Sequence, residues 1–297
     1  MTGKKLAGAG LRGQSAGETK LCTVGKSGSG LTYCGYDVAD LTENATFEEV
    51  AYLLFNGELP NTEQLSAYKT ELKSMRDLPS ELKAMLQHIP ADAHPMDVMR
   101  TGCSFLGNLE PEVDFSEQRK AANRLLAAFP AIMCYWYRYS HNGEEIDCVT
   151  DEDSMGGHFL KLLRGETPSE LHRKVMDVSL ILYAEHELNA STFTTRVITG
   201  TGADFYSAIT GGIGALRGSK HGGANEVAFE TLKRYNNPEE AKRDILNRVA
   251  NKEIIIGFGH PVYTIADPRN KIIKDVSKIL SVEQNNMKLY DIAARIE

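Results

Sequence analysis

The glycine-rich stretch GTGADFYSAITGGIGALRGSKHGG occupies residues 200–223 and holds eight of the 26 glycines in the chain. Glycine lets two helices approach closely, or lets the backbone turn beside a ligand. Gly211, Gly212 and Gly214 lie in an apolar context of helical character, which favours close helix packing. The glycines around His221 flank a polar turn instead, which favours a role in ligand binding.

Helix-start signals recur outside this stretch. Residues 46–49 read TFEE, which is the spacing of a capping box. Asn237 followed by Pro238, and Asp267 followed by Pro268, each combine a cap with proline at the first helical position. Pro130 lies within an apolar stretch, and we expect it to kink or split the helix there.

Strand signals are sparse. Residues 20–36 are the best candidate, because residues 26–30 (KSGSG) can form the turn of a small hairpin. Neither an alternating βα pattern nor an internal repeat is present in the sequence. The predicted class is therefore mainly α, with a minor N-terminal β-hairpin.

Composition narrows the function classes. The 297 residues are 42% hydrophobic and carry a net charge of -7 without a basic stripe, so nucleic acid is a poor partner. The sequence contains no run of 18 apolar residues, so we expect no membrane span. Residues 1–13 lack the apolar core of a secretory signal. The five cysteines form no CxxC motif, which indicates reduced thiols in a cytoplasmic protein.

Three of the eight histidines lie in unusual local sequences. His186 interrupts an apolar segment, and His221 and His260 lie on turns framed by glycine or proline, which can present an imidazole to a cleft. No HxxxH or HExxH motif places two histidines on one helical face, so a metal site is disfavoured. The absence of GxSxG and of GxxxxGK[ST] likewise argues against a serine hydrolase and a phosphate loop.

Arg269 follows the cap formed by Asp267 and Pro268, nine residues after His260. It is either a surface arginine or a fork-shaped cation for a substrate carboxylate. Three imidazoles and an arginine suggest a small anionic substrate that bears a carbonyl group.

Taken together and in this order, the motifs resemble those of the citrate synthase family over about residues 20 to 297. The landmarks are GYD at 35–37, FEEV at 47–50, HPM at 94–96, HELNAS at 186–191, HGGANE at 221–226, GFGHPVY at 257–263 and DPR at 267–269. Within the family, the segments at 22–28, 135–143 and 262–267 look like the branch of bacterial 2-methylcitrate synthases.

The resemblance implies condensation of an acyl-CoA, here propionyl-CoA, with oxaloacetate, followed by thioester hydrolysis. His221 resembles the histidine that hydrogen-bonds the thioester oxygen as it becomes an enolate, a role for which it must be neutral. His260 resembles the histidine that polarises the ketone of oxaloacetate and supplies a proton. His186, Asn189 and Arg269 match residues that bind oxaloacetate. The backbone stretch that contacts CoA corresponds to Ile255, Ile256, Gly257, Phe258 and Gly259.

The resemblance also implies an architecture: a large helical domain at residues 1–219 and a smaller helical domain that begins near residue 220. The smaller domain closes over the substrates and continues beyond residue 297. A homodimer is implied, with no permanently bound cofactor and CoA entering only as part of substrate and product.

Three residues of the family's active site have no counterpart in the sequence. The aspartate that removes the α-proton of the acyl-CoA lies in a later segment resembling Pro-Asn-x-Asp, and two substrate arginines lie later still; no equivalents occur here. We therefore expect a truncated chain that is inactive by itself. Two alternatives stay open: a citrate synthase that uses acetyl-CoA, and a non-catalytic protein that binds oxaloacetate or CoA.

Overall fold

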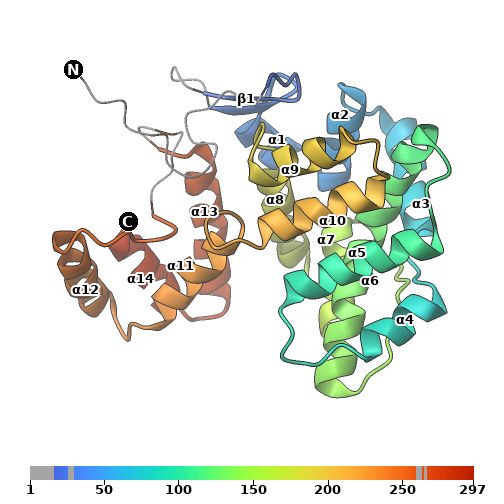
Figure 1. The fold of residues 1–297 in the computed structure, drawn as a ribbon. Coiled ribbons are helices and arrows are strands. Elements are labelled where there is room, and N and C mark those ends of the chain that lie inside the picture. The colour runs from blue at the N-terminus through green and yellow to red at the C-terminus, as the bar shows by residue number, and fades with distance from the viewer. Residues whose placement is uncertain (1–16, 26–29, 259–262, 264–265) are drawn as a thin grey trace, which may run out of the picture.

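The computed structural model describes residues 17–25, 30–258, 263 and 266–297 (Figure 1). These residues form a mainly helical protein with one small sheet, as the sequence predicts. The helices are α1 (Val38–Asn44), α2 (Phe47–Asn56), α3 (Thr62–Ser74), α4 (Ser80–Gln87), α5 (Pro95–Leu109), α6 (Gln118–Asn142), α7 (Met155–Arg164), α8 (Glu170–Tyr183), α9 (Ala190–Thr199), α10 (Phe205–Leu216), α11 (Gly223–Lys233), α12 (Pro238–Ala250), α13 (Pro268–Glu283) and α14 (Lys288–Ile296).

The predicted helix starts are confirmed. Thr46 and Glu49 form a reciprocal capping box at α2. The side chains of Asn237 and Asp267 cap α12 and α13, each with proline at the first helical position. The helix α6 runs unbroken through Pro130, so the proline does not split it. Buried alanine and isoleucine side chains on both sides of Pro130 pack this helix into the core, which offsets the lost backbone hydrogen bond.

The predicted hairpin is confirmed as part of a three-stranded antiparallel sheet. Strand β1 (Cys22–Val24) pairs with β2 (Leu31–Tyr33), which pairs with β3 (Tyr36–Asp37). Cys22 lies opposite Tyr33 and Val24 opposite Leu31 in the register. The turn predicted at residues 26–30 has only Gly30 within the described residues.

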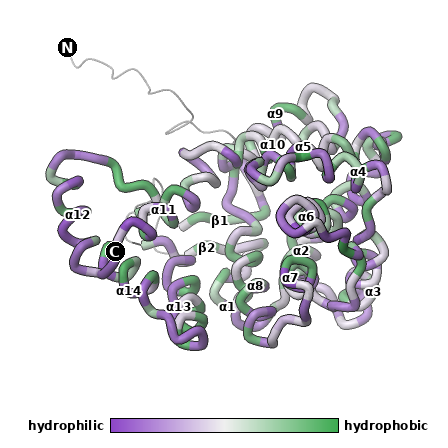
Figure 2. The backbone as a smooth tube through the Cα atoms, turned by 90° about the horizontal axis from the view of Figure 1, so that it is seen from below, coloured by the Kyte–Doolittle hydropathy of each residue, from purple (hydrophilic) through white to green (hydrophobic). Residues whose placement is uncertain are grey.

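Two large hydrophobic cores hold most of the helices together. One is centred on α4, α5, α6 and α10 and contains Trp136, and the other joins the sheet to α1, α2 and α8. The helix α13 packs its apolar side against the second core, through Ile272, Ile273 and Val276. A third, small cluster of Tyr235, Ala241 and Ile292 joins α11, α12 and α14. These helices and α13 lie on one side of the molecule, and Figure 2 shows how much more hydrophilic α12 is than the core helices.

The predicted close packing at the glycine-rich stretch is confirmed. Helix α10 lies against α9, and a methyl group on Gly212 would stand 2.5 Å from Oγ1 of Thr195. A methyl group on Gly211 would collide with the side chain of Ile198. Glycine at these positions therefore sets the separation of α9 and α10, and with it the position of the turn that follows α10. Among the described residues, no helix is long and apolar enough to cross a membrane.

A pair of acidic side chains lies inside this helical body. Glu48 on α2 is 2% exposed, and one of its oxygens accepts a hydrogen bond of 2.5 Å from the backbone N–H of Met155. Asp177 on α8 is 7% exposed, and burial, together with the nearby charge of Glu48, raises its pKa to about 7. The folded protein therefore holds a proton on Asp177 that the unfolded chain releases near pH 4.

This proton makes stability depend on pH. Because the pKa of Asp177 is raised on folding, its unfavourable contribution grows as the pH rises from about 4 to about 7, at roughly 1.4 kcal/mol per pKa unit. We expect the melting temperature of Asp177→Asn, relative to that of the wild type, to be higher at pH 8 than at pH 5. Thermal denaturation of both proteins at the two pH values checks this. An equal difference at both would contradict it.

Candidate active site

His186 lies in the loop between α8 and α9. Its Nε2 atom is 2.9 Å from the hydroxyl oxygen of Tyr263, and the two rings meet edge to face with centroids 5.6 Å apart. Tyr263 comes from the segment between α12 and α13, so this contact joins parts of the chain that are 77 residues apart. Burial raises the pKa of Tyr263 to about 12, so the tyrosine remains a neutral hydrogen-bonding partner.

Asn189 ends the same loop and caps α9. Its side-chain oxygen accepts hydrogen bonds from the backbone N–H groups of Ser191 and Thr192, at 3.1 and 3.0 Å. The cap fixes the first turn of α9, where the backbone N–H of Ser191 also faces Nε2 of His221. The structure thus gives Asn189 a positioning contact, and its predicted contact with substrate stays a prediction.

His221 lies in the turn between α10 and α11, with its ring at the N-terminus of α9. Its Nε2 atom lies 3.3 Å from the backbone nitrogen of Ser191 and 2.9 Å from the hydroxyl oxygen of the same residue. A backbone N–H can only donate, so Nε2 must accept, and the proton of the neutral ring is on Nδ1. Burial lowers the pKa of His221, and the positive end of the α9 dipole also disfavours a charged imidazole. The ring is therefore a neutral N–H donor, which is the state that the role implied by the family resemblance requires.

Arg269 lies in the first turn of α13 and is half-buried. Its guanidinium forms a paired contact with Asp267, with Nε to Oδ1 at 3.0 Å and Nη2 to Oδ2 at 2.6 Å. Burial acts to lower the pKa of Arg269, but the Asp267 carboxylate raises it, so the arginine stays charged. Asp267 thus holds one edge of the fork in place. The remaining Nη1 edge can receive a carboxylate.

The predicted CoA-contacting stretch packs against α11, the helix that follows His221. Gly257 has a φ of 91°, and a methyl group on it would collide with the side chain of Ala228. Glycine is therefore required twice over at this position, for its backbone conformation and for its close approach to α11. Ile255 and Phe258 close the turn through a backbone hydrogen bond of 3.3 Å.

The structure brings together most of the predicted site residues. Ser191 links the loop of His186 and Asn189 to His221, and Tyr263 links His186 to the segment that leads to Arg269. Gly259 and His260 lie outside the described residues. Within the part of the chain that the structure describes, no group of three or more His, Cys, Asp or Glu side chains could hold a metal ion.

Residues 10–297 match the family described as "Citrate synthase, C-terminal domain". The chain belongs to the citrate synthase family. A 2-methylcitrate synthase of Shewanella oneidensis is 62% identical over 294 residues, covering 99% of this chain and 78% of that protein. The 2-methylcitrate synthase 2 of Corynebacterium glutamicum is 42% identical over 268 residues, covering 88% of this chain and 70% of that protein.

The fold of the citrate synthase family is shown by solved structures as well. The citrate synthase of Thermoplasma acidophilum, solved as a ternary complex with carboxymethyl coenzyme A and oxaloacetate, superposes with a TM-score of 0.90 at 29% sequence identity. The match covers 97% of this chain and 76% of that one. The citrate synthase of Thermotoga maritima gives a TM-score of 0.86 at 33% identity, over 98% of this chain and 77% of that one.

Two residues of the site had no assigned role in the sequence-based prediction. Ser191 fixes the tautomer of His221, and Tyr263 contacts His186. Both lie within motifs that the sequence singles out, HELNAS and GFGHPVY, but nothing in the sequence says which histidine each one faces. That information comes only from the packing of α9 and from the return of the chain towards α13.

The tautomer of His221 can be measured directly. We expect the ¹⁵N chemical shifts of the ring, in protein labelled at histidine, to show a neutral imidazole protonated on Nδ1 at pH 7, because Nε2 accepts from the α9 N-terminus. The spectrum of His221→Gln assigns the resonance. A proton on Nε2, or a charged ring at pH 7, would contradict the geometry.

Proposed function

We propose that the protein is a 2-methylcitrate synthase, which condenses propionyl-CoA with oxaloacetate and water to give 2-methylcitrate and CoA. The observation that carries the proposal is the 62% identity with the Shewanella oneidensis 2-methylcitrate synthase over nearly the whole chain. The neutral N–H donor at His221 supports the same chemistry, because enolate formation needs a donor placed where negative charge develops.

In this reaction the α-carbon of propionyl-CoA loses a proton and negative charge develops on the thioester oxygen. The Nδ1–H of His221 donates a hydrogen bond to that oxygen, and the ring stays neutral while it does so. The α-carbon then attacks the ketone of oxaloacetate, whose oxygen takes a proton as it becomes a hydroxyl group. We assign this proton to His260 and removal of the α-proton to the aspartate of the family's later segment, both by resemblance.

Oxaloacetate carries two carboxylates, and the described residues offer groups to hold them. Arg269 has a fixed charge and a fixed orientation, since Asp267 holds one edge of its guanidinium. His186 faces the same segment of chain through Tyr263. For propionyl-CoA, the turn formed by residues 255–258 lies against α11, which starts immediately after the turn of His221. This arrangement supports binding of both substrates around the imidazole of His221.

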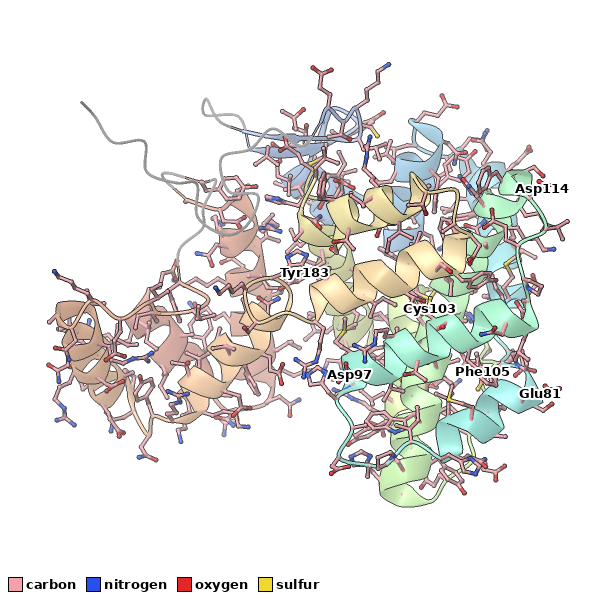
Figure 3. The ribbon with its side chains drawn as sticks, in the orientation of Figure 1. Glu81, Asp97, Cys103, Phe105, Asp114 and Tyr183 are labelled. Carbon is pink, nitrogen blue, oxygen red and sulfur yellow. The ribbon has the colours of Figure 1, made fainter. Side chains whose placement is uncertain are left out.

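The contacts around α11 support a domain boundary near residue 220, although α13 packs apolar side chains against the core of the larger body. Helices α11, α12 and α14 share a small core of their own, and polar contacts join α11 to the larger body. Glu226 on α11 lies 3.1 Å from Nε2 of His94, at the start of α5, and 4.0 Å from Nη1 of Arg217, at the end of α10. Asp97 and Tyr183 are both labelled in Figure 3 on the side of the body that faces α11, and the hydroxyl of Tyr183 accepts a hydrogen bond of 2.8 Å from Asn225. Such polar contacts can be exchanged when a small domain closes over substrate and excludes water.

A cytoplasmic homodimer is the form we infer for the enzyme. Each of the five cysteines is a free thiol, in keeping with a reducing compartment. The helix α9 contains Phe193, Val197 and Ile198 but has no buried residue, and Val197 is 54% exposed. An unusually exposed apolar helix beside the site suits a subunit contact.

The subunit contact predicts a concentration-independent dimer that Val197→Asp weakens. Sedimentation velocity of the full-length protein should give twice the subunit mass, and the variant should shift towards the monomer. Val249→Asp is the matched control, because Val249 is 55% exposed and lies on α12, in the small cluster of α11, α12 and α14. A monomeric wild type would overturn the inference.

Substrate choice separates the proposal from its nearest alternative. We expect thiol release from propionyl-CoA in the presence of oxaloacetate to show a higher kcat/KM than release from acetyl-CoA. A clear preference for acetyl-CoA would make the protein a citrate synthase instead. Absence of release from either, with oxaloacetate still bound, would favour a non-catalytic binding protein.

The two described histidines should respond differently to replacement. In the full-length enzyme, His221→Ala should lower kcat by about 10²–10³-fold, as loss of a preorganised donor does, with little change in oxaloacetate affinity. His186→Ala should mainly raise the KM for oxaloacetate. Steady-state kinetics in both substrates measure the two effects, and unchanged turnover in His221→Ala would refute its role.

A further inference from the structure

Glu187 follows His186 and adopts a backbone conformation that residues other than glycine seldom adopt. Its φ is 54°, and only Cys34, Lys252 and Asn285 share a positive φ among the non-glycine residues that the structure describes. A residue persists in this conformation only where its surroundings hold it there. The loop of His186 is therefore held in shape by contacts from outside the loop.

The contacts come from the first strand of the N-terminal sheet. The backbone N–H of Val24 on β1 donates to Oε1 of Glu187 at 3.2 Å. Cys22, on the same strand, also interacts with the backbone of Glu187, and this interaction offsets part of the rise that burial causes in the pKa of the Cys22 thiol. The side chain of Glu187 is thus fastened to strand β1 by Val24, and both Val24 and Cys22 are buried.

A second strand holds the start of the same loop. The hydroxyl of Tyr33 on β2 donates to the backbone carbonyl of Ile181 at 2.9 Å, at the end of α8. Tyr33 has no measurable exposure, so this anchor lies in the core. The sheet therefore fixes the loop on both sides of His186, while Tyr263 contacts the imidazole itself.

We propose that Glu187 is a positioning residue for oxaloacetate binding: it fastens the strained loop of His186 to strand β1, so that the imidazole is already oriented before substrate arrives. The small N-terminal sheet is then part of the binding apparatus and not only a cover for the helices. This inference rests on the proposed function, because it assumes that His186 contacts oxaloacetate.

In this proposal the loop is held by the side-chain oxygen of Glu187 that accepts from Val24, and not by the backbone conformation alone. Glu187→Gln keeps an oxygen that can accept from Val24, whereas Glu187→Ala removes it and keeps the backbone strain. Glu187→Gly removes the acceptor and relieves the strain, because glycine accepts a positive φ. Glu117→Ala is the matched control, since Glu117 also accepts from a backbone N–H, that of Val113 at 3.0 Å, but lies away from the site.

The experiment measures steady-state kinetics of the full-length enzyme with oxaloacetate and acyl-CoA varied separately, after circular dichroism has shown that each variant is folded. We expect Glu187→Ala and Glu187→Gly to raise the KM for oxaloacetate about tenfold, the size expected for one lost hydrogen bond to a charged group. The KM for acyl-CoA and kcat should change little. Glu187→Gln should restore the wild-type KM to within about threefold, and Glu117→Ala should match the wild type.

The possible failures are distinguishable. Wild-type affinity in Glu187→Ala, or full rescue by Glu187→Gly, would overturn the positioning role while leaving the proposed function intact. If His186→Ala binds oxaloacetate as tightly as the wild type in titration calorimetry, the assumed role of His186 fails first. Equal losses of kcat and of affinity for both substrates in Glu187→Ala would indicate general damage to the fold and would also refute the proposal.

Discussion

The contact between His221 and the first turn of α9 is the interaction on which the site depends. It joins the α8–α9 loop to the α10–α11 turn, and it sets both the tautomer and the charge of the imidazole. Neither element could make this contact alone. It exists because Gly211 and Gly212 let α10 approach α9 closely, so that the turn after α10 returns to the N-terminus of its neighbour.

The electrostatics of the site follow from the same arrangement. The site combines two groups of different charge. The imidazole of His221 is neutral with a defined N–H, and Arg269 is kept charged by Asp267. The first suits an oxygen on which charge develops, and the second suits a carboxylate that is charged throughout. Helix caps contribute directly here, because Asn189 and Asp267 both cap a helix while fixing a site element.

The sequence predicted more of the fold's local elements than of its contacts. Caps at Thr46, Asn237 and Asp267 and the N-terminal hairpin are local in cause, so they could be predicted from neighbouring residues. Close packing at Gly211 was predictable from its apolar context. Two contacts could not be predicted: Ser191 with His221, and Val24 with Glu187. Both depend on how distant segments of the chain pack together, and local sequence patterns do not contain that information. The roles of the histidines came from ordered motifs shared with the citrate synthase family.

The most direct test of the account is the structure of the full-length enzyme with oxaloacetate and carboxymethyl coenzyme A bound. The account predicts that Nδ1 of His221 faces the acyl portion of the CoA analogue at about 3 Å, with Nε2 still accepting from Ser191, and that a carboxylate of oxaloacetate meets Arg269. A His221 ring turned so that Nε2 faces the analogue, or oxaloacetate bound away from His186 and Arg269, would contradict it.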